Sequence, residues 1–246
     1  MRHWYRKRVT AAARADGERS QFQMVQFNIQ EREVTIKVVY YGPALSGKTT
    51  NLLAVHSLVD PEHRGKMITL DTQDDRTIFF DLLPLFFQTA NDLSVKIKLF
   101  TVPGQVIHDS TRRVVLVGAD AVAFIANAQH EKQQENIESF NNLMVNLKLN
   151  GFARGDMPIV IQFNKLDLPD AMSPEEVESA KQKSQHPIYP AIALQGKGVI
   201  KTLAGLLGLT WASLERKHDL GAKFGLTREV FLGHVFRSLE IEGGGD

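Results

Sequence analysis

Residues 42–49 read Gly-Pro-Ala-Leu-Ser-Gly-Lys-Thr and fit the pattern G-x-x-x-x-G-K-[ST] of a phosphate-binding loop. A β-branched and aromatic run, residues 34–41, precedes the loop, and residues 49–58 follow it with apolar side chains at helical spacing. Strand, loop and helix therefore stand in the order that the motif requires. A glycine-rich turn that matched the motif by chance would not need this order. The residues expected to bind the nucleotide phosphates are Gly42, Ala44, Leu45, Ser46, Gly47, Lys48, Thr49 and Thr50.

The chemistry of this loop comes from its backbone and from two side chains. Glycines let the backbone close around an anion, and the exposed amides and the positive end of the following helix attract phosphate. Lys48 is expected to reach the β- and γ-phosphates, and the Thr49 hydroxyl is expected to ligate Mg²⁺. The loop therefore predicts a P-loop nucleotide-binding protein.

Downstream of the loop, apolar strands alternate with amphipathic helices. The expected strands are residues 93–101, 119–128, 158–163 and 189–194. The expected helices are one whose apolar face holds Ile137, Phe140, Met144 and Leu147 and which Gly151 closes, a short one that begins at the capping box Ser173 to Glu176, and one whose core residues span 199–214. Such alternation predicts an α/β fold with a mostly parallel central sheet and helices on both faces. The ligand of such a sheet binds at the carboxyl ends of the strands.

Length and composition suggest one domain with an extension at each end. The 246 residues, 43% of them hydrophobic, suffice for a single core. Residues 1–23 lack periodicity and hold six basic and two acidic side chains in their first 20 positions, so we expect a basic, disordered leader. Residues 24–217 form the predicted domain. In residues 218–246, apolar spacing predicts an amphipathic helix that either packs back on the domain or binds a partner.

Several classes of protein are excluded by what the sequence lacks. Without any cysteine there is no disulfide, no cysteine metal site and no palmitoyl or prenyl anchor, and Arg2 stands where myristoylation requires glycine. The longest apolar stretch, residues 114–128, is short for a membrane span and contains Asp120. We therefore expect a cytoplasmic protein without a lipid anchor. A nucleic-acid partner is not expected; the basic leader would support one only through strongly salt-dependent binding.

A second motif, Asn164-Lys165-Leu166-Asp167, follows a buried strand and fits N-K-x-D. The Asp167 carboxylate can accept hydrogen bonds from the N1–H and the 2-amino group of guanine. Adenine lacks this pair of donors, so the carboxylate would discriminate against ATP by up to about 10⁴-fold. The motif predicts a guanine nucleotide, GTP or GDP, and speaks against a P-loop ATPase or kinase.

Two further positions suggest a GTP-dependent switch. Thr77 lies in a polar loop after the P-loop helix, where a threonine can ligate Mg²⁺ when a γ-phosphate is present. In Gly104-Gln105 the glycine amide can sense the γ-phosphate, and the glutamine can orient the attacking water. The aspartate that P-loop GTPases usually carry three residues before this glycine is replaced by Thr101.

Together these motifs closely resemble the MglA-type bacterial Ras-like GTPases of gliding motility and cell polarity, over residues 24–217. The stretches that carry the resemblance are Tyr40-Tyr-Gly-Pro through Lys48-Thr-Thr-Asn-Leu52, Asp75-Arg-Thr-Ile-Phe-Phe-Asp-Leu-Leu-Pro84, Phe100-Thr-Val-Pro-Gly-Gln105, Asn164-Lys-Leu-Asp-Leu-Pro169 and Gly196-Lys-Gly-Val199. Thr-Val-Pro-Gly-Gln is that family's own variant, which makes the match specific.

The resemblance implies a Ras-like three-layer fold and a GTP/GDP switch whose GTP form marks a cell pole. It implies an activator of hydrolysis, a homodimeric MglB-type protein of the Roadblock fold, and polarity or motility effectors on the switch loops. By motif, Arg76 matches the family's built-in arginine finger and Gln105 its water-positioning glutamine. Ala193, followed by Leu194, falls where a backbone amide meets the guanine oxygen.

The chain departs from the family pattern in three places. Ala44 replaces the second glycine of Gly-Pro-Gly, and a Cβ there would crowd the catalytic glutamine and arginine. Ile107-His108 stands where the family usually has two aromatic residues. The third departure is the extensions, since residues 1–23 precede Met24, which matches the family's usual start. Two functions therefore remain open: a switch that hydrolyses GTP, and a GTP-binding interaction protein with slow or no hydrolysis.

Overall fold

A computed structural model describes residues 26–28, 32–70, 80–89, 92–105 and 108–237. The strands are β1 (Gln26–Asn28), β2 (Glu33–Tyr41), β3 (Ile68–Leu70), β4 (Phe80–Gln88), β5 (Ser94–Thr101), β6 (Ala121–Asn127), β7 (Ile159–Asn164) and β8 (Ile188–Pro190). The α-helices are α1 (Lys48–Leu58), α2 (Asp109–Leu116), α3 (Gln133–Leu149), α4 (Pro174–Lys183), α5 (Val199–His218), α6 (Leu220–Phe224) and α7 (Arg228–Arg237). Short 3₁₀ turns are η1 (Pro61–His63), η3 (His130–Lys132) and η4 (Ala193–Gln195).

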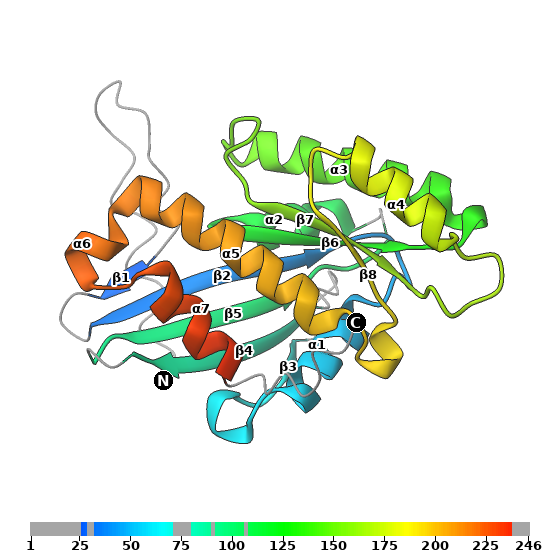
Figure 1. Ribbon diagram of the computed structural model, residues 1–246. Helices are drawn as coiled ribbons and strands as arrows, with labels where there is room; N and C mark the ends of the chain where they lie inside the picture. The colour runs from blue at the N-terminus through cyan, green and yellow to red at the C-terminus, as the bar shows by residue number, and fades with distance from the viewer. Residues whose placement is uncertain (1–25, 29–31, 71–79, 90–91, 106–107, 238–246) are drawn as a thin grey trace, which may run out of the picture.

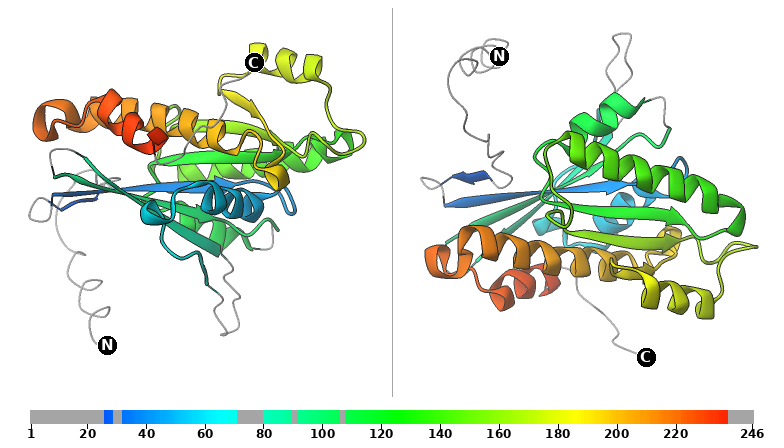
Figure 2. Two further views of the ribbon diagram at one scale, coloured as in Figure 1. Left: turned by 60° about the horizontal axis from the view of Figure 1, so that its bottom comes forward. Right: turned by 90° about the horizontal axis from the view of Figure 1, so that it is seen from above.

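The strands form one sheet in the order β3-β4-β5-β2-β6-β7-β8, and β1 pairs with β2 (Figure 1). Strands β5, β2, β6, β7 and β8 run parallel to one another, whereas β4 is antiparallel to both β3 and β5 and β1 is antiparallel to β2. One apolar core joins the sheet to α1, α5, α6 and α7, and a second joins its other face to α2 and α3 (Figure 2). The predicted α/β fold with a mostly parallel sheet is confirmed.

Most predicted elements appear within one or two residues of their expected ends. The helix after Ser173 begins with a complete capping box, in which the Ser173 and Glu176 side chains each accept from the other's backbone N–H. The last predicted strand, residues 189–194, is wrong in its second half, because β8 ends at Pro190 and residues 193–195 form a 3₁₀ turn. Gly196 and Gly198, both at positive φ, turn the chain there.

Strand β4 was not predicted. The segment 67–80, predicted as a polar surface loop, is wrong at its ends, because Ile68–Leu70 form β3 and Phe80 begins β4. Residues 71–79, Arg76 and Thr77 among them, lie outside the described part of the chain. Inside β4, Leu83, Leu85 and Phe87 are buried in alternation. Pro84 obscures this pattern in the sequence, but it lies beyond the last pair with β3, and its carbonyl accepts a hydrogen bond from Gly65.

The C-terminal helix packs back on the domain. Phe231 and Leu226 are buried in the core that contains α5, and the indole N–H of Trp211 donates to the Leu226 carbonyl at 3.2 Å. Helix α7 also contacts β4, so it bridges α5 and the antiparallel part of the sheet. The part of the predicted apolar face whose side chains are described, Val230 and Phe231, thus packs within the chain, as does Leu232.

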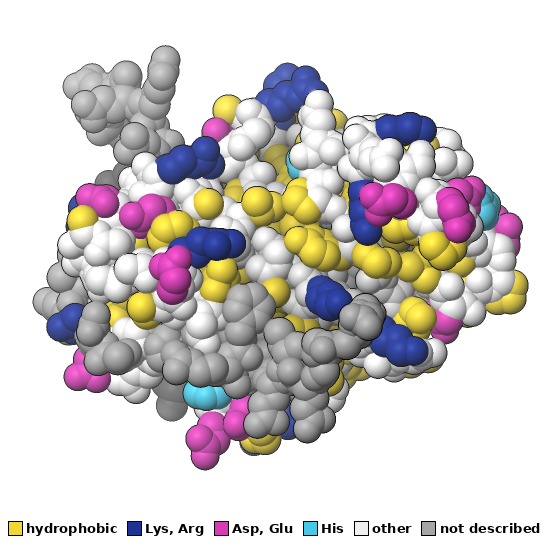
Figure 3. Space-filling view, in the orientation of Figure 1, with side chains coloured by type: hydrophobic (Ala, Val, Ile, Leu, Met, Phe, Trp, Pro, Cys, Tyr) yellow, Lys and Arg dark blue, Asp and Glu magenta, His cyan; other side chains and the backbone are white. Residues whose placement is uncertain are grey.

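The surface is mixed in charge. On the face drawn in Figure 3, acidic and basic side chains are interspersed, as the formal net charge of +1 suggests. Within the described residues, no helix combines the length and the apolar composition that crossing a membrane requires.

Candidate nucleotide-binding site

A cavity of about 640 Å³ opens where β2 and β5 end and α1 begins. Its walls come from the predicted phosphate loop, from the loop after β5, from β4 and from the segment after β7. The lining residues are Ala44, Leu45, Gly47, Lys48, Thr49, Thr50, Thr69, Phe80, Asp81, Thr101, Val102, Pro103, Gly104 and Lys165. The fold therefore brings the predicted phosphate loop, Gly104 and Lys165 to one cavity, and it adds Thr69, Phe80 and Asp81.

Two glycines of the loop are required by close packing. A Cβ on Gly42 would lie 2.2 Å from the Ile125 carbonyl oxygen, and a Cβ on Gly47 would lie 2.2 Å from Asn164 Nδ2. Both residues also have positive φ, at which other side chains are strained. Gly47 is the N-cap of α1, so the loop delivers its backbone amides to the positive end of this helix.

Lys48 is buried, and among the described residues its ammonium has carbonyl oxygens alone as hydrogen-bond partners. Its ammonium donates to the Gly42 carbonyl at 3.1 Å and to the Pro43 carbonyl at 2.6 Å. Burial, with a smaller contribution from the Arg112 guanidinium, lowers the pKa of Lys48 to about 7, while the Asp81 carboxylate opposes the shift. An anion such as phosphate would restore the full charge of this ammonium.

A second polar group in the loop also suits an anion. The Ser46 hydroxyl oxygen is buried and finds no hydrogen-bond partner among the residues that the structure describes. A buried hydroxyl without a partner costs free energy. Together with Lys48 and the start of α1, this hydroxyl fits a phosphate-binding cradle.

The asparagine of N-K-x-D connects the phosphate loop to the segment around Ala193. Asn164 is buried; its Nδ2 donates to the Ser46 carbonyl at 2.8 Å, and its Oδ1 accepts from the Ala193 amide at 2.8 Å. The Ala193 amide, which the sequence assigned to the guanine oxygen, is therefore engaged with Asn164. A contact of that amide with the base would require this bond to be exchanged.

A buried polar chain supports the loop from beneath. Gln162 on β7 donates from Nε2 to the Asn51 side chain at 3.0 Å and to the Thr202 hydroxyl at 2.8 Å. Asn51 in turn donates to the Gly47 carbonyl at 2.9 Å. Strand β7 and helices α1 and α5 are thus joined directly below the loop.

Asp81 is the site residue that sequence reasoning missed. Its Oδ2 accepts from the Thr49 hydroxyl at 2.7 Å and from the Thr101 hydroxyl at 3.0 Å, and its Oδ1 accepts from Thr69 at 3.0 Å. The Asp81 amide also donates to Thr101 Oγ1 at 2.8 Å. Thr101 occupies the position of the expected aspartate, and the neighbouring strand supplies a carboxylate beside it.

The sequence indicates that a carboxylate is missing at Thr101, but it does not point to Asp81 as the replacement unless β4 is recognised. The loss of a carboxylate at Thr101 implies a replacement nearby if the site binds Mg²⁺, which prefers one or two carboxylates together with phosphate oxygens. Asp81 lies 20 positions earlier, and only the antiparallel pairing of β4 with β5 brings it to Thr101.

The loop after β5 touches the phosphate loop at its unusual residue. A Cβ on Gly104 would lie 2.4 Å from the Ala44 Cα, so only glycine allows these backbones to approach. Gln105 is exposed at the edge of the cavity, and its carbonyl accepts from the His108 amide at 3.2 Å. Ala44 therefore lies against Gly104, the residue directly before the predicted water-positioning glutamine Gln105.

Two of the predicted base-binding residues, Asp167 and Leu194, are exposed, whereas Asn164 and Ala193 are buried. The Asp167 side chain faces solvent, and Leu194 is 84% exposed. Lys165 has a φ of 70°, which turns the chain sharply after β7. Arg76 and Thr77, the predicted arginine finger and switch threonine, lie outside the described residues.

Comparison with known proteins agrees with this geometry. No protein-family model matches the chain. The mutual gliding-motility protein MglA of Myxococcus xanthus is 42% identical over 189 residues, which are 77% of this chain and 97% of that protein. With this degree of identity over nearly the whole relative, and with the P-loop and Lys165 of N-K-x-D lining one cavity, the chain belongs to the MglA family, the small GTPases of the gliding-motility type.

Proposed function

We propose that this protein is a molecular switch that binds GTP and GDP with Mg²⁺ and hydrolyses GTP slowly. The observation that carries the proposal is that a buried Lys48 ammonium, hydrogen-bonded to backbone carbonyls, and the Thr49–Asp81 hydrogen bond lie at the same loop. The first suits phosphate oxygens, and the second suits a divalent cation. Both are needed to bind a nucleotide together with its metal.

For the metal, Thr49 and Asp81 are the residues that would hold Mg²⁺. Their oxygens are 2.7 Å apart, so they already face one another, and Thr77 is proposed as a further ligand in the GTP form. When bound, Mg²⁺ neutralises charge on the phosphates. The role of this chain is to present the hydroxyl and the carboxylate side by side.

For the base, we propose that Asp167 binds the N1–H and 2-amino edge of guanine. Asn164 supports this role from within the fold, because it fixes the start of the Asp167 loop to the Ser46 carbonyl. Lys165, which lines the cavity, would cover the phosphate side of the nucleoside.

For hydrolysis, we propose that Gln105 orients the water that attacks the γ-phosphorus while the bond to the β–γ bridging oxygen breaks, giving GDP and phosphate. Arg76 would stabilise the charge that develops on the phosphoryl group. The contact between Gly104 and Ala44 bears on this step, because the Ala44 Cβ adds bulk where the loop carrying Gln105 meets the phosphate loop. Slow hydrolysis is the expected consequence.

The same contact favours a second candidate function, a GTP-binding interaction protein without appreciable hydrolysis. Such a protein would stay in its GTP form and act by recruiting partners. In either case we propose, from family membership, a homodimeric Roadblock-fold activator of the MglB type, effectors that control polarity or motility, and a position at a cell pole. The relative's name, a gliding-motility protein, is in keeping with such a role.

Single-turnover hydrolysis separates the two candidates. GTP-loaded wild type and Ala44→Gly would each be followed with and without the Roadblock-fold protein of the same organism. A cycling switch predicts stimulated turnover in both proteins, faster in Ala44→Gly. Stimulation of the glycine variant alone would favour the interaction protein, and failure of both proteins to bind GTP would overturn the proposal.

A further inference from the structure

The loop that carries Asp167 runs from the end of β7 to the start of α4, over residues 165–173. Its backbone is unusual at two points, Lys165 and Asp170, which have φ values of 70° and 63°. Positive φ is unfavourable for a lysine, whereas aspartate tolerates it, so contacts from elsewhere help to hold the loop that begins at Lys165. These contacts come from the segment between β6 and α3.

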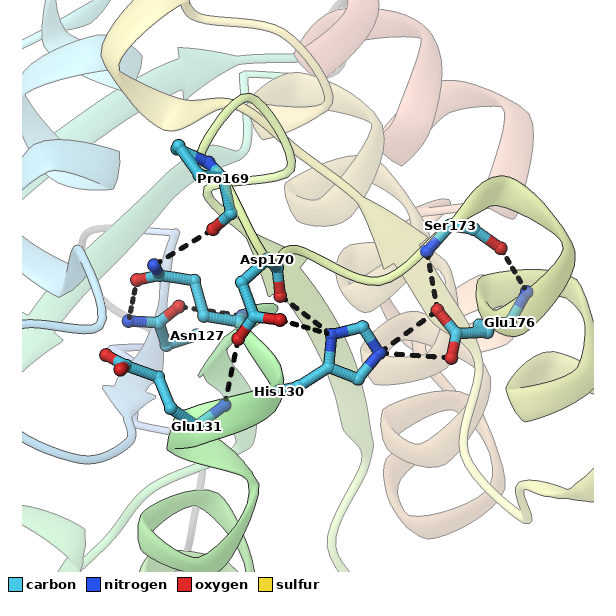
Figure 4. A network of polar contacts seen from close by, with 8 residues as sticks. Asn127, His130, Glu131, Pro169, Asp170, Ser173 and Glu176 are labelled. Atoms are coloured by element: carbon cyan, nitrogen blue, oxygen red, sulfur yellow. Dashed lines mark hydrogen bonds and ion pairs between the residues drawn. The ribbon is translucent and has the colours of Figure 1, made fainter.

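Backbone and amide hydrogen bonds first join the two segments. The His130 amide donates to the Asp170 carbonyl at 2.9 Å, and the Met172 amide donates to the Ala128 carbonyl at 2.9 Å. The Gln129 side chain adds a hydrogen bond from Nε2 to the Pro169 carbonyl at 3.2 Å (Figure 4). The loop therefore runs along η3 and its preceding residues rather than free in solvent.

The ring of His130 then links the loop to the next helix. Its Nδ1 lies 2.7 Å from the Asp170 carbonyl oxygen, and its Nε2 lies 3.0 and 3.2 Å from the two carboxylate oxygens of Glu176 (Figure 4). Each neighbour is an acceptor. A neutral imidazole has one N–H and can satisfy only one of them, whereas the imidazolium satisfies both.

Glu176 is itself an anchor of α4. Its Oε2 accepts from the Ser173 amide at 2.7 Å, which closes the capping box at the start of the helix. His130 consequently holds the middle of the Asp167 loop at Asp170 and its end at the first turn of α4. The ring thus connects Asp170 in the loop to Glu176 in the first turn of α4.

We propose that His130 is a positioning residue for guanine recognition: its imidazolium fixes the loop that presents Asp167 to the base, and loss of its proton weakens the grip on guanine nucleotides. This inference rests on the proposed role of Asp167 in binding guanine. It concerns a residue that does not line the cavity.

The charges around the ring support the protonated form. Glu176 from α4 and Asp170 from the loop face it, and both raise the pKa of His130, with the Glu176 hydrogen bond as the largest cause. On η3 itself, Glu131 donates its amide to Asp170 Oδ2 at 3.4 Å, while Lys132 is paired with Glu135 at 2.9 Å. The ring's contribution is therefore complete below its ordinary pKa and is lost as pH rises through the raised value.

The test is the dissociation rate of fluorescent GDP from the loaded full-length protein between pH 6 and 8.5. His130→Arg keeps two donors and a charge at every pH, and His130→Gln removes the charge. Lys132→Gln, one charge removed from the same turn without a contact to the loop, is the matched control. Because other groups, Lys48 included, titrate equally in all four proteins, the difference between profiles isolates His130.

The ratio of the GDP release rate at pH 8.5 to the rate at pH 6 should be about two- to fivefold larger for the wild type than for His130→Arg. This size suits an exposed charged contact. His130→Gln should release GDP at the fast rate throughout, and Lys132→Gln should follow the wild type. Parallel profiles of wild type and His130→Arg would overturn the inference alone. Absence of GDP binding by the wild type would overturn the proposed function with it.

A second readout separates positioning from general stability. Inosine diphosphate lacks the 2-amino group that Asp167 would bind, so the ratio of GDP to IDP affinity reports how well the carboxylate is placed. His130→Gln should lower this ratio at pH 6 and His130→Arg should preserve it. An equal loss for both nucleotides, together with a lower melting temperature, would show that His130 only stabilises the fold and would contradict the proposal.

Discussion

The two ends of the candidate site are built in different ways. At the phosphate end, Lys48, Asn164 and Asp81 are buried and each is bonded to fixed atoms of neighbouring elements. At the base end, Asp167 faces solvent and its loop is held by the exposed His130–Glu176 pair. Buried polar contacts are costly to break and insensitive to salt, whereas exposed pairs are weak and screened. We therefore expect affinity to depend on the phosphate end and fine control on the base end.

The largest effect should follow removal of the Lys48 ammonium. Lys48→Ala deletes the one buried cation that lines the cavity, and the loss of a charge-assisted contact to phosphate should weaken GDP binding by at least about 100-fold. Isothermal titration against GDP measures this loss. Retention of binding within tenfold would contradict the assignment of the phosphate end.

Asn164→Ala should be the next most severe change, and it should act on stability as well. It leaves the Ser46 carbonyl and the Ala193 amide without their partner inside the protein. We expect the free energy of unfolding to fall by about 2–4 kcal/mol. Urea unfolding without nucleotide measures it, and a change below 1 kcal/mol would show that these groups find other partners.

Asp81→Asn should act on the metal rather than on the fold. The variant keeps the size of the side chain but removes the charge beside Thr49. We expect the gain in GTP affinity on adding Mg²⁺ to shrink by roughly 10-fold, the weight of one charged contact. Thr69→Val is the matched control, because Thr69 binds the other oxygen of the same carboxylate and should leave the Mg²⁺ effect intact.

A smaller, pH-dependent effect should distinguish the two ends. Without an anion the pKa of Lys48 is lowered to about 7 by burial, and bound phosphate should raise it. On nucleotide binding, Lys48 should therefore take up close to one proton at pH 8 and almost none at pH 6. Because binding requires this proton above pH 7, the affinity for nucleotide should decline there. Calorimetry in buffers of different ionisation enthalpy counts the protons, and the absence of uptake at pH 8 would contradict the buried, uncompensated state of Lys48.

The phosphate end was largely predictable from the sequence because local motifs encode it. Glycine is required at positions 42 and 47 because a Cβ at either position would lie less than 2.5 Å from a neighbouring atom. Such requirements keep the spacing of the two glycines fixed in the sequence. Asn164 was predicted as a base-binding residue, and its bonds to Ser46 and Ala193 explain why an asparagine stands there.

What could not be predicted depends on pairing between distant segments. Asp81 joins the site only through the β4–β5 pairing, and Pro84 hides β4 from a pattern-based reading. His130 gains its partners from residues 40 and 46 positions later, and an isolated histidine after a strand carries no signal of such contacts.

Recognition of guanine nucleotides through Asp167 is best tested by exchanging the base preference. Xanthine carries a carbonyl where guanine has its 2-amino group, so Asp167→Asn should transfer preference from GDP to XDP. We predict that the wild type binds GDP at least about 10³-fold more tightly than XDP or ADP, and that the variant reverses the order for GDP and XDP. Equal affinity of the wild type for GDP and ADP, or an unchanged preference in the variant, would contradict the account.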